Sequence, residues 1–260
     1  MTAVATEVRI PDGIGKTMTL LGDRIVFVTI AHDDSPMHPL DDCDGMGHIY
    51  SLSRKHESYN YAGVHEALNS NPDVVPLSYF EHGNCIWDVR GSSMSNWPDF
   101  NWDGVDFAGV WIPDKALYGN EPEGEQFQLK EVDGYQCTDC DTKFLEAKVQ
   151  CPGCKKDFQI PGNGSGFEII KIKVSTPERR AWMEEQAASA CRVFTQYCNG
   201  EVYAYSVAIY NVRRDSRGEV YDRLSDYRRD KPVAEDSCSG LFGDDVFDEV
   251  KSVVQSLIER

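Results

Sequence analysis

TPERRAWMEEQAASACRVFTQYCNGEVYAYSVAIYNV, residues 176–212, is the stretch that decides the fold class. Thr176 supplies a capping hydroxyl and Pro177 fits a first turn, so a helix is predicted to begin there. Asn199-Gly200 is a common helix stop, and an apolar stripe runs up to it, made of Trp182, Ala190, Val193, Phe194 and Tyr197. Glu201–Val212 alternates in the manner of a strand. A long helix followed at once by a strand indicates a mixed fold.

The flanking sequence extends this pattern on both sides. Downstream, a turn at 215–218 predicts a second strand from Glu219, and Asp244 or Asp245 is expected to cap a final helix. Upstream, β-branched and aromatic runs predict strands at 24–31, 85–90, 106–112, 126–132 and 167–174. Shorter helices are expected at 60–69 and from 113. The predicted class is α+β, a mostly antiparallel sheet with two main helices on one face and a small zinc-ribbon insertion built on four cysteines.

The insertion is predicted from two Cys-x-x-Cys knuckles. Their four thiolates are Cys137, Cys140, Cys151 and Cys154, a separation typical of one tetrahedral Zn²⁺. A closed four-cysteine site has no open coordination position, so a structural zinc is expected rather than a catalytic one. Strands predicted on both sides give three segments: an acidic α+β part at 1–134, the zinc ribbon at 135–160, and an α+β part at 161–260 that packs with the first as one domain.

Acidity is the second strong signal of the sequence. The formal net charge is −17, and residues 1–134 hold 22 Asp and Glu against 8 Lys and Arg. Such a field repels nucleic acids and anionic membranes and attracts basic surfaces. We therefore expect a protein partner with a basic surface, no direct nucleic-acid contact and no membrane contact. Acidity that only keeps the protein soluble is the plain alternative.

Acidic residues gather in the loop at 32–48, and acidic and aromatic residues alternate in the segment at 85–113. Aromatic anchors rimmed by charge are typical of interfaces, whereas the same rings could equally fill a core. The predicted partner-binding residues are Asp33, Asp34, Asp41, Asp42, Asp44, Trp97, Asp99, Trp102, Asp103 and Asp106.

Four short motifs resemble a recurring pattern: 44–50 (DGMGHIY), 106–113 (DFAGVWIP), 198–203 (CNGEVY) and 236–240 (DSCSG). The pattern is similar to that of uncharacterised acidic proteins encoded by tailed bacteriophages, which often have an aromatic residue where this chain has Ser239. The resemblance implies a phage protein acting in the bacterial host cytoplasm, and it carries no catalytic residues. The absence of a signal peptide or a long apolar run at the sequence level agrees with a cytoplasmic location.

Three functions follow from these observations. The leading hypothesis is an interaction protein that inhibits a host nucleic-acid-binding or defence protein through its negative face, which would make it a nucleic-acid mimic. The first alternative is a metal-dependent hydrolase that uses a His/Asp loop containing His32, Asp34, His38 and His48. The second is a zinc-ribbon adaptor acting on transcription. Because the sequence carries no nucleophile elbow, paired-histidine helix or phosphate cradle, an enzyme is not the expected class.

Overall fold

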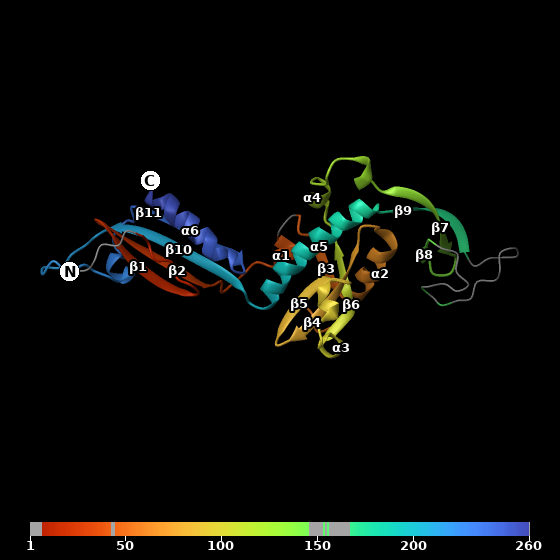
Figure 1. Ribbon diagram of the computed structural model, residues 1–260, viewed down its shortest axis with the longest axis horizontal. Coiled ribbons are helices and arrows are strands. Elements are labelled where there is room, and N and C mark those ends of the chain that lie inside the picture. Colours follow the sequence, from red (N-terminus) through yellow and green to blue (C-terminus); the bar gives the residue numbers. More distant parts are fainter. Residues whose placement is uncertain (1–6, 43–44, 146–152, 154, 156–166, 260) are drawn as a thin grey trace. The chain divides into compact units, whose positions relative to one another are not determined.

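A computed structural model describes residues 7–42, 45–145, 153, 155 and 167–259 of the 260-residue chain. The chain forms two compact units (Figure 1). The first combines the residues up to His38 with those from Thr195 onward, and the second is Pro39–Phe194. The chain therefore leaves the first unit and returns to it, whereas composition suggested three successive segments.

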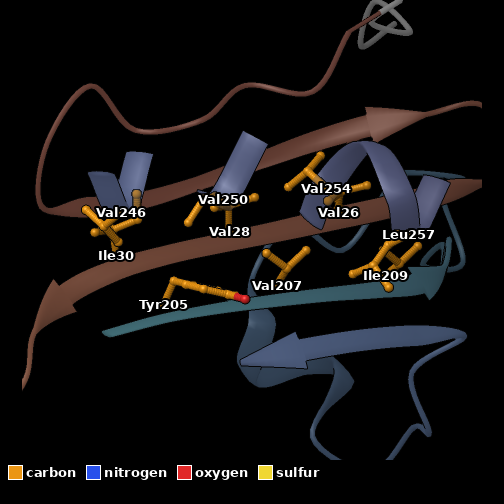
Figure 2. Packing of buried hydrophobic residues seen from close by; sticks show 10 residues of the cluster. All are labelled: Val26, Val28, Ile30, Tyr205, Val207, Ile209, Val246, Val250, Val254 and Leu257. Atoms are coloured by element: carbon orange, nitrogen blue, oxygen red, sulfur yellow. The ribbon is translucent and has the colours of Figure 1, made fainter. Parts of the chain in front are cut away.

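The first unit is an antiparallel sheet covered by a helix. Its strands lie in the order β1-β2-β10-β11. They are β1 (Gly15–Leu21), β2 (Arg24–His32), β10 (Val202–Asn211) and β11 (Ala234–Phe242), and the helix is α6 (Asp245–Ile258). Alternate residues of β2 and β10 meet apolar residues spaced three or four apart on α6, as Figure 2 shows. This core consists of Val26, Val28, Ile30, Tyr205, Val207, Ile209, Val246, Val250, Val254 and Leu257.

The opposite face of this sheet is covered by the segment between β10 and β11. Tyr227, at the end of the 3-10 helix η3 (Leu224–Tyr227), is fully buried against Ile25 and Phe27. The prediction of a strand from Glu219 is wrong. That region makes only an isolated bridge between Arg214 and Val220, because burying Tyr227 requires the chain to cross the sheet face rather than pair along its edge.

The second unit contains a sheet with the order β3-β6-β4-β5. Its strands are β3 (His48–Ser51), β4 (Val75–His82), β5 (Asn84–Val89) and β6 (Gly104–Ile112). Helix α2 (Tyr61–Ser70) begins where the Asn60 side chain accepts a hydrogen bond from the Gly63 amide, and it buries Val64 and Ala67 against this sheet. Four shorter helical segments accompany it: α1 (Pro39–Asp42), η1 (Ser93–Asn96), α3 (Phe100–Asp103) and α4 (Lys115–Tyr118).

A third, smaller sheet with the order β8-β7-β9 lies in the same unit. Its strands are β7 (Lys130–Cys137), β8 (Lys143–Phe144) and β9 (Phe167–Val174), and the long helix α5 (Pro177–Cys198) follows. Strand β7 begins later than predicted because residues 125–127 form the 3-10 helix η2 (Glu125–Phe127). The mixed α and β class with mostly antiparallel pairing is confirmed, but the prediction of one sheet is wrong, since the strands lie in three.

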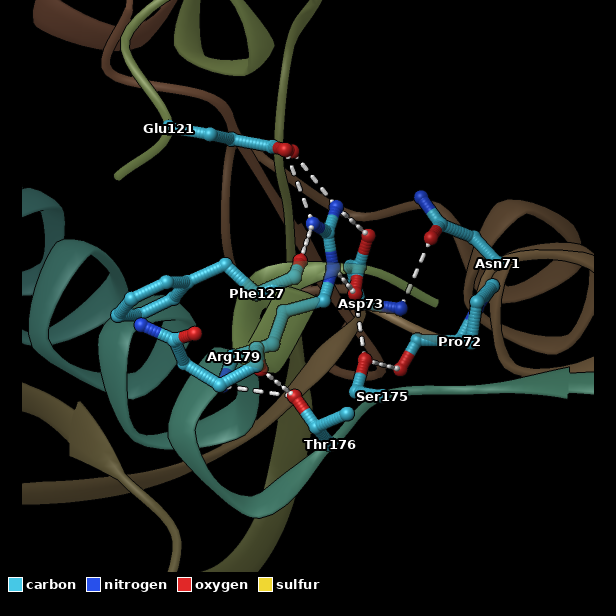
Figure 3. Close-up of polar contacts among 9 residues, drawn as sticks. Asn71, Pro72, Asp73, Glu121, Phe127, Ser175, Thr176 and Arg179 are labelled. Carbon is cyan, nitrogen blue, oxygen red and sulfur yellow. Dashed lines mark hydrogen bonds and ion pairs between the residues drawn. The ribbon is translucent and has the colours of Figure 1, made fainter. Parts of the chain in front are cut away.

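A buried ion network joins α5 to the loops around it (Figure 3). The Arg179 side chain is 5% exposed and the Asp73 side chain 1% exposed. Arg179 donates Nε and Nη2 to the two Asp73 oxygens, at 2.8 Å each. It also pairs with Glu121 at 2.6 Å and donates to the Phe127 carbonyl. Because every donor direction of the guanidinium meets an acceptor, one side chain holds three loop segments to α5.

This network predicts acid sensitivity. Burial alone would raise the pKa of Asp73, but hydrogen bonds from Arg179 and Ser175 outweigh burial and lower that pKa below its ordinary value. A lowered folded-state pKa gives stability that is present above the unfolded-state value and is lost as pH falls through the folded-state value. We expect the urea midpoint to fall from about pH 5 downward. Asp73→Asn should reduce this fall of the urea midpoint with pH, whereas Arg180→Ala should show the same fall as wild type. Identical pH profiles for wild type and Asp73→Asn would contradict the assignment of acid sensitivity to Asp73.

Within the described residues, no helix combines the length and the apolar character needed to cross a membrane.

Candidate functional site

A cleft of about 450 Å³ opens in the second unit beside β4 and β6. The loop after β3 and the end of α3 complete its walls. Its lining mixes aromatic, charged and apolar side chains: Leu52, Ser53, Lys55, His56, Tyr79, Glu81, Trp102, Asp103, Val105, Phe107 and Ala108, with Gly104. A concave site with a few polar groups among apolar ones is the usual form of a binding site.

The His56 and Tyr79 rings form the inner wall of this cleft, and Trp87, which is not part of the lining, packs against both of them. The His56 ring lies 4.5 Å from the Tyr79 ring and 5.1 Å from the Trp87 ring, measured between centroids. His56 Nδ1 shares a 2.7 Å hydrogen bond with Ser51 Oγ. Burial lowers the pKa of His56, against an opposing effect of Glu81. The wall is therefore aromatic, and the lowered pKa of His56 favours its neutral form.

The rim of the cleft carries Trp102, which is 87% exposed. Its exposure follows from helix geometry. Phe100 is buried against Phe80, with ring centroids 6.5 Å apart, and holds α3 to the sheet. Two residues further along a helix the side chain has turned by about 200°, so Trp102 points away from the face that Phe100 buries. Val105, three residues after Trp102 and also in the cleft lining, is 48% exposed. Together they form an exposed apolar rim.

The acidic residues near this rim are partly neutralised by the chain itself. Asp103 lies 2.7 Å from His82 Nδ1, and its hydrogen bond and charge raise the pKa of His82. Asp106 accepts from Arg90 Nε at 2.9 Å. Asp99, beside the start of α3, is exposed, and Trp97 is 40% exposed with its ring against Phe80. The predicted aromatic and acidic residues thus lie in one region, with fewer free carboxylates than the sequence suggests.

The predicted acidic loop divides between the two units. Asp33, in the first unit, accepts hydrogen bonds from the amides of Ser35 and Gly240 at 3.0 and 2.9 Å, so it closes a turn onto β11. Asp34 is exposed. Asp41 and Asp42 lie in α1 of the second unit. Asp44 and the side chains of Asp41 and Asp42 are outside the part of the chain that the structure describes.

The histidines of the hydrolase hypothesis make ring contacts instead of converging. The His32 ring stacks on Tyr203 at 5.2 Å, and the His38 ring meets Tyr197 edge-on at 5.0 Å. His48 is an exposed residue of β3 in the other unit. Within the described ranges, no group of three or more His, Cys, Asp or Glu side chains could hold a metal ion.

The predicted zinc ligands are described in part. Cys137 is buried at the end of β7. Its amide donates a hydrogen bond to the Thr142 carbonyl, and its carbonyl accepts one from the Asp141 amide, at 3.0 Å each. These bonds bend the chain so that Cys140 follows in a tight turn. Cys151 and Cys154 lie outside the described residues. Gly153 between them is described, and a side chain there would collide with Thr142 and come within 3.3 Å of the Cys140 sulfur.

The two knuckles share one backbone feature. Asp141 and Lys155, each directly after the second cysteine of its knuckle, have φ of 56° and 61°. They are the non-glycine residues of positive φ in the part of the chain that the structure describes. Residues other than glycine rarely adopt this conformation, so Asp141 and Lys155 share an uncommon backbone geometry at equivalent sequence positions.

Comparison of the chain with protein-family models, with curated proteins and with solved structures finds no match. The candidate site therefore rests on the geometry above.

The residues that the sequence analysis missed are those of the inner wall. His56, Tyr79 and Glu81 come from a loop and a strand that were not predicted. The apolar run Val74–Phe80 carried a signal for a strand, since β-branched and aromatic residues dominate it. Nothing in the sequence around His56 indicates that it packs between two aromatic rings.

Proposed function

We propose that this protein is an interaction protein that binds a basic surface of another protein at the Trp102 cleft. The observation that carries this proposal is the exposure of Trp102 at a cleft whose lining also holds the His56 and Tyr79 rings. Tryptophan is among the residues that most often dominate the binding energy of protein interfaces, especially where it meets a pocket. A partner that covers this ring and fills the cleft would remove both from water.

The chemistry of the cleft favours a cationic side chain of the partner. Glu81 and Asp103 lie in the lining, and the Trp102 face attracts an ammonium or guanidinium group. Lys55 in the same lining opposes this preference, but the formal charge of the whole chain, −17, draws basic surfaces toward it. In a bacterial cytoplasm, a phage-encoded protein with this property would inhibit a host nucleic-acid-binding or defence protein by occupying its basic groove.

We propose in addition that Cys137, Cys140, Cys151 and Cys154 hold a structural Zn²⁺. The uncommon backbone geometry directly after each knuckle and the closeness of Gly153 to the Cys140 sulfur support this proposal. A bound zinc would supply a cross-link between the two knuckles, since each Cys-x-x-Cys pair contributes two thiolates. The cysteines would then serve the shape of the second unit rather than a reaction.

Replacing Trp102 with alanine tests the interaction. Immobilised wild type, Trp102→Ala and Tyr61→Ala are compared for the proteins that each retains from bacterial host lysate, and for the dissociation constant of the retained partner. Tyr61 is an exposed aromatic residue of α2 and serves as the matched control. We expect Trp102→Ala to raise the dissociation constant about 30-fold or more, since truncating a central interface tryptophan costs at least about 2 kcal/mol. Tyr61→Ala should bind as wild type does.

Salt provides the second measurement of this test. Binding to a basic partner should weaken as the salt concentration rises, because exposed charge attraction is screened. A partner held equally well by Trp102→Ala, or one that is insensitive to salt, would contradict the proposal.

A further inference from the structure

A second cleft in the same unit has the opposite charge character. It has a volume of about 460 Å³ and lies between the C-terminal end of α2, the strand β9 and the segment at β8. Among the described residues, its lining includes four cationic side chains and no Asp or Glu: Leu68, Asn69, Ser70, Asn71, Pro72, Lys143, Leu145, Lys171, Ile172, Lys173, Val174, Ser175 and Arg180. In a chain with 43 acidic and 26 basic residues, such a lining is opposite to the average surface.

The strand geometry explains how the cations meet. Lys171 and Lys173 are two residues apart on β9, so they project from the same face of the sheet. Lys143 reaches the cleft from β8, and Arg180 reaches it from the first turns of α5. Cations from three separate elements therefore converge at the end of α2, where amide and hydroxyl groups of Asn69, Ser70, Asn71 and Ser175 add hydrogen-bonding capacity.

The cations differ in how far the chain already neutralises them. Lys171 pairs with Asp133 at 2.7 Å, and Arg180 donates Nε to Glu184 at 2.9 Å. Glu131 faces Lys173 in the strand register. Even so, within the described part of the chain no carboxylate lies at ion-pair distance from Lys173 or from Lys143. These two ammonium groups are the ones available to a ligand.

A neighbouring hollow extends this cleft. His65, Cys140, Thr142 and Gly153 line the hollow, which shares Leu68, Asn69 and Lys143 with the cleft. The two form one basic groove that runs from β9 to the first cysteine knuckle. A groove with lysines on both β8 and β9 suits a ligand that carries more than one anionic group.

We propose that this basic groove binds a phosphate-bearing ligand, with Lys143 and Lys173 as its principal contacts. Lysine ammonium groups are common phosphate ligands, acting as point charges without a fixed geometry. The acidic remainder of the chain does not prevent this binding, because at about 0.1 M salt charges more than about 10 Å away are largely screened. The net charge of the chain predicts no contact with nucleic acid, and the proposed binding is an exception confined to this groove.

The ligand could be a free nucleotide or a nucleic-acid strand, and one experiment distinguishes them. Fluorescence anisotropy is measured with a labelled single-stranded DNA 12-mer at about 0.1 M salt, where the distant acidic charges are screened, with ATP added as competitor. Displacement by ATP indicates a nucleotide site, and DNA binding that ATP does not displace indicates a strand site. The test does not depend on the Trp102 cleft, so Trp102→Ala should bind both probes as wild type does.

The variant Lys143→Gln/Lys173→Gln identifies the groove. We expect it to weaken binding at least 10-fold, because hydrogen bonds between an ammonium group and a phosphate oxygen are roughly twice as strong as those between neutral groups. The matched control Lys16→Gln/Lys115→Gln removes the same charge from exposed positions outside the groove and should change binding less than about two-fold. All four side chains are exposed, so folding should be preserved. Wild type that binds neither DNA nor ATP, or equal losses in both double variants, would overturn the proposal.

Discussion

Arg179→Ala is expected to lower the free energy of unfolding by about 3–5 kcal/mol, the usual cost of removing one partner from a buried ion pair. The substitution leaves Asp73 at 1% exposure without its guanidinium partner. It also releases Glu121 and the Phe127 carbonyl from α5. The loss is large because an unpaired buried carboxylate must either stay charged in a poor environment or take up a proton.

The neighbouring arginine offers a matched control for this prediction. Arg180 also lies on α5, but its pair with Glu184 is partly exposed, with side-chain exposures of 34% and 44%. Exposed pairs contribute less than about 1 kcal/mol, and the hydrogen bond of 2.7 Å that Arg180 donates to the Val74 carbonyl contributes about 1 kcal/mol, so Arg180→Ala should cost less than Arg179→Ala. Urea denaturation followed by circular dichroism measures both variants. Equal losses of stability in the two would mean that the buried network does not hold the second unit together.

Zinc content is expected to be one per chain in wild type and close to zero in Cys137→Ser. Structural zinc in small Cys-rich sites is bound with apparent free energies of about 10–16 kcal/mol, which a missing thiolate greatly reduces. Metal analysis of purified protein, before and after reconstitution with zinc, measures the stoichiometry.

Cys238→Ser is the control for this second prediction, because Cys238 is an exposed residue of β11 in the other unit. It should keep the zinc of wild type. Wild type that binds no zinc after reconstitution, or Cys137→Ser that binds as much as wild type, would reject the assignment of a four-cysteine zinc site. A second metal per chain would instead favour the hydrolase hypothesis.

Local signals in the sequence predicted several elements well. The Thr176 cap, Pro177 and the Asn199-Gly200 stop predicted α5, the β-branched run at 167–174 predicted β9, and the apolar alternation of 201–212 predicted β10. These elements are encoded within their own residues by capping and periodicity. The separation of strands into three sheets was not predictable in this way, because β2 pairs with β10 through contacts between distant segments.

The candidate site likewise combines features that local sequence predicts with features that depend on distant contacts. Trp102 and its acidic neighbours could be chosen from composition alone, but the ion pairs of Asp103 with His82 and of Asp106 with Arg90 depend on strand pairing. The basic groove was hidden for a related reason. The net negative charge of the whole chain gives no sign of a local basic site. Lys143 and Lys173 lie 30 positions apart in the sequence and come together only in the folded chain.

The discontinuous first unit has a consequence for synthesis on the ribosome. Strand β2 pairs with β10 from a position roughly 180 residues earlier in the chain. Until β10 emerges, β2 has no partner on that side and its apolar face has no α6 to cover it. The second unit, which is continuous in sequence, is complete before that point. The nascent chain therefore carries an uncovered hairpin of β1 and β2 through most of its translation, a species that is prone to aggregation and suited to capture by chaperones.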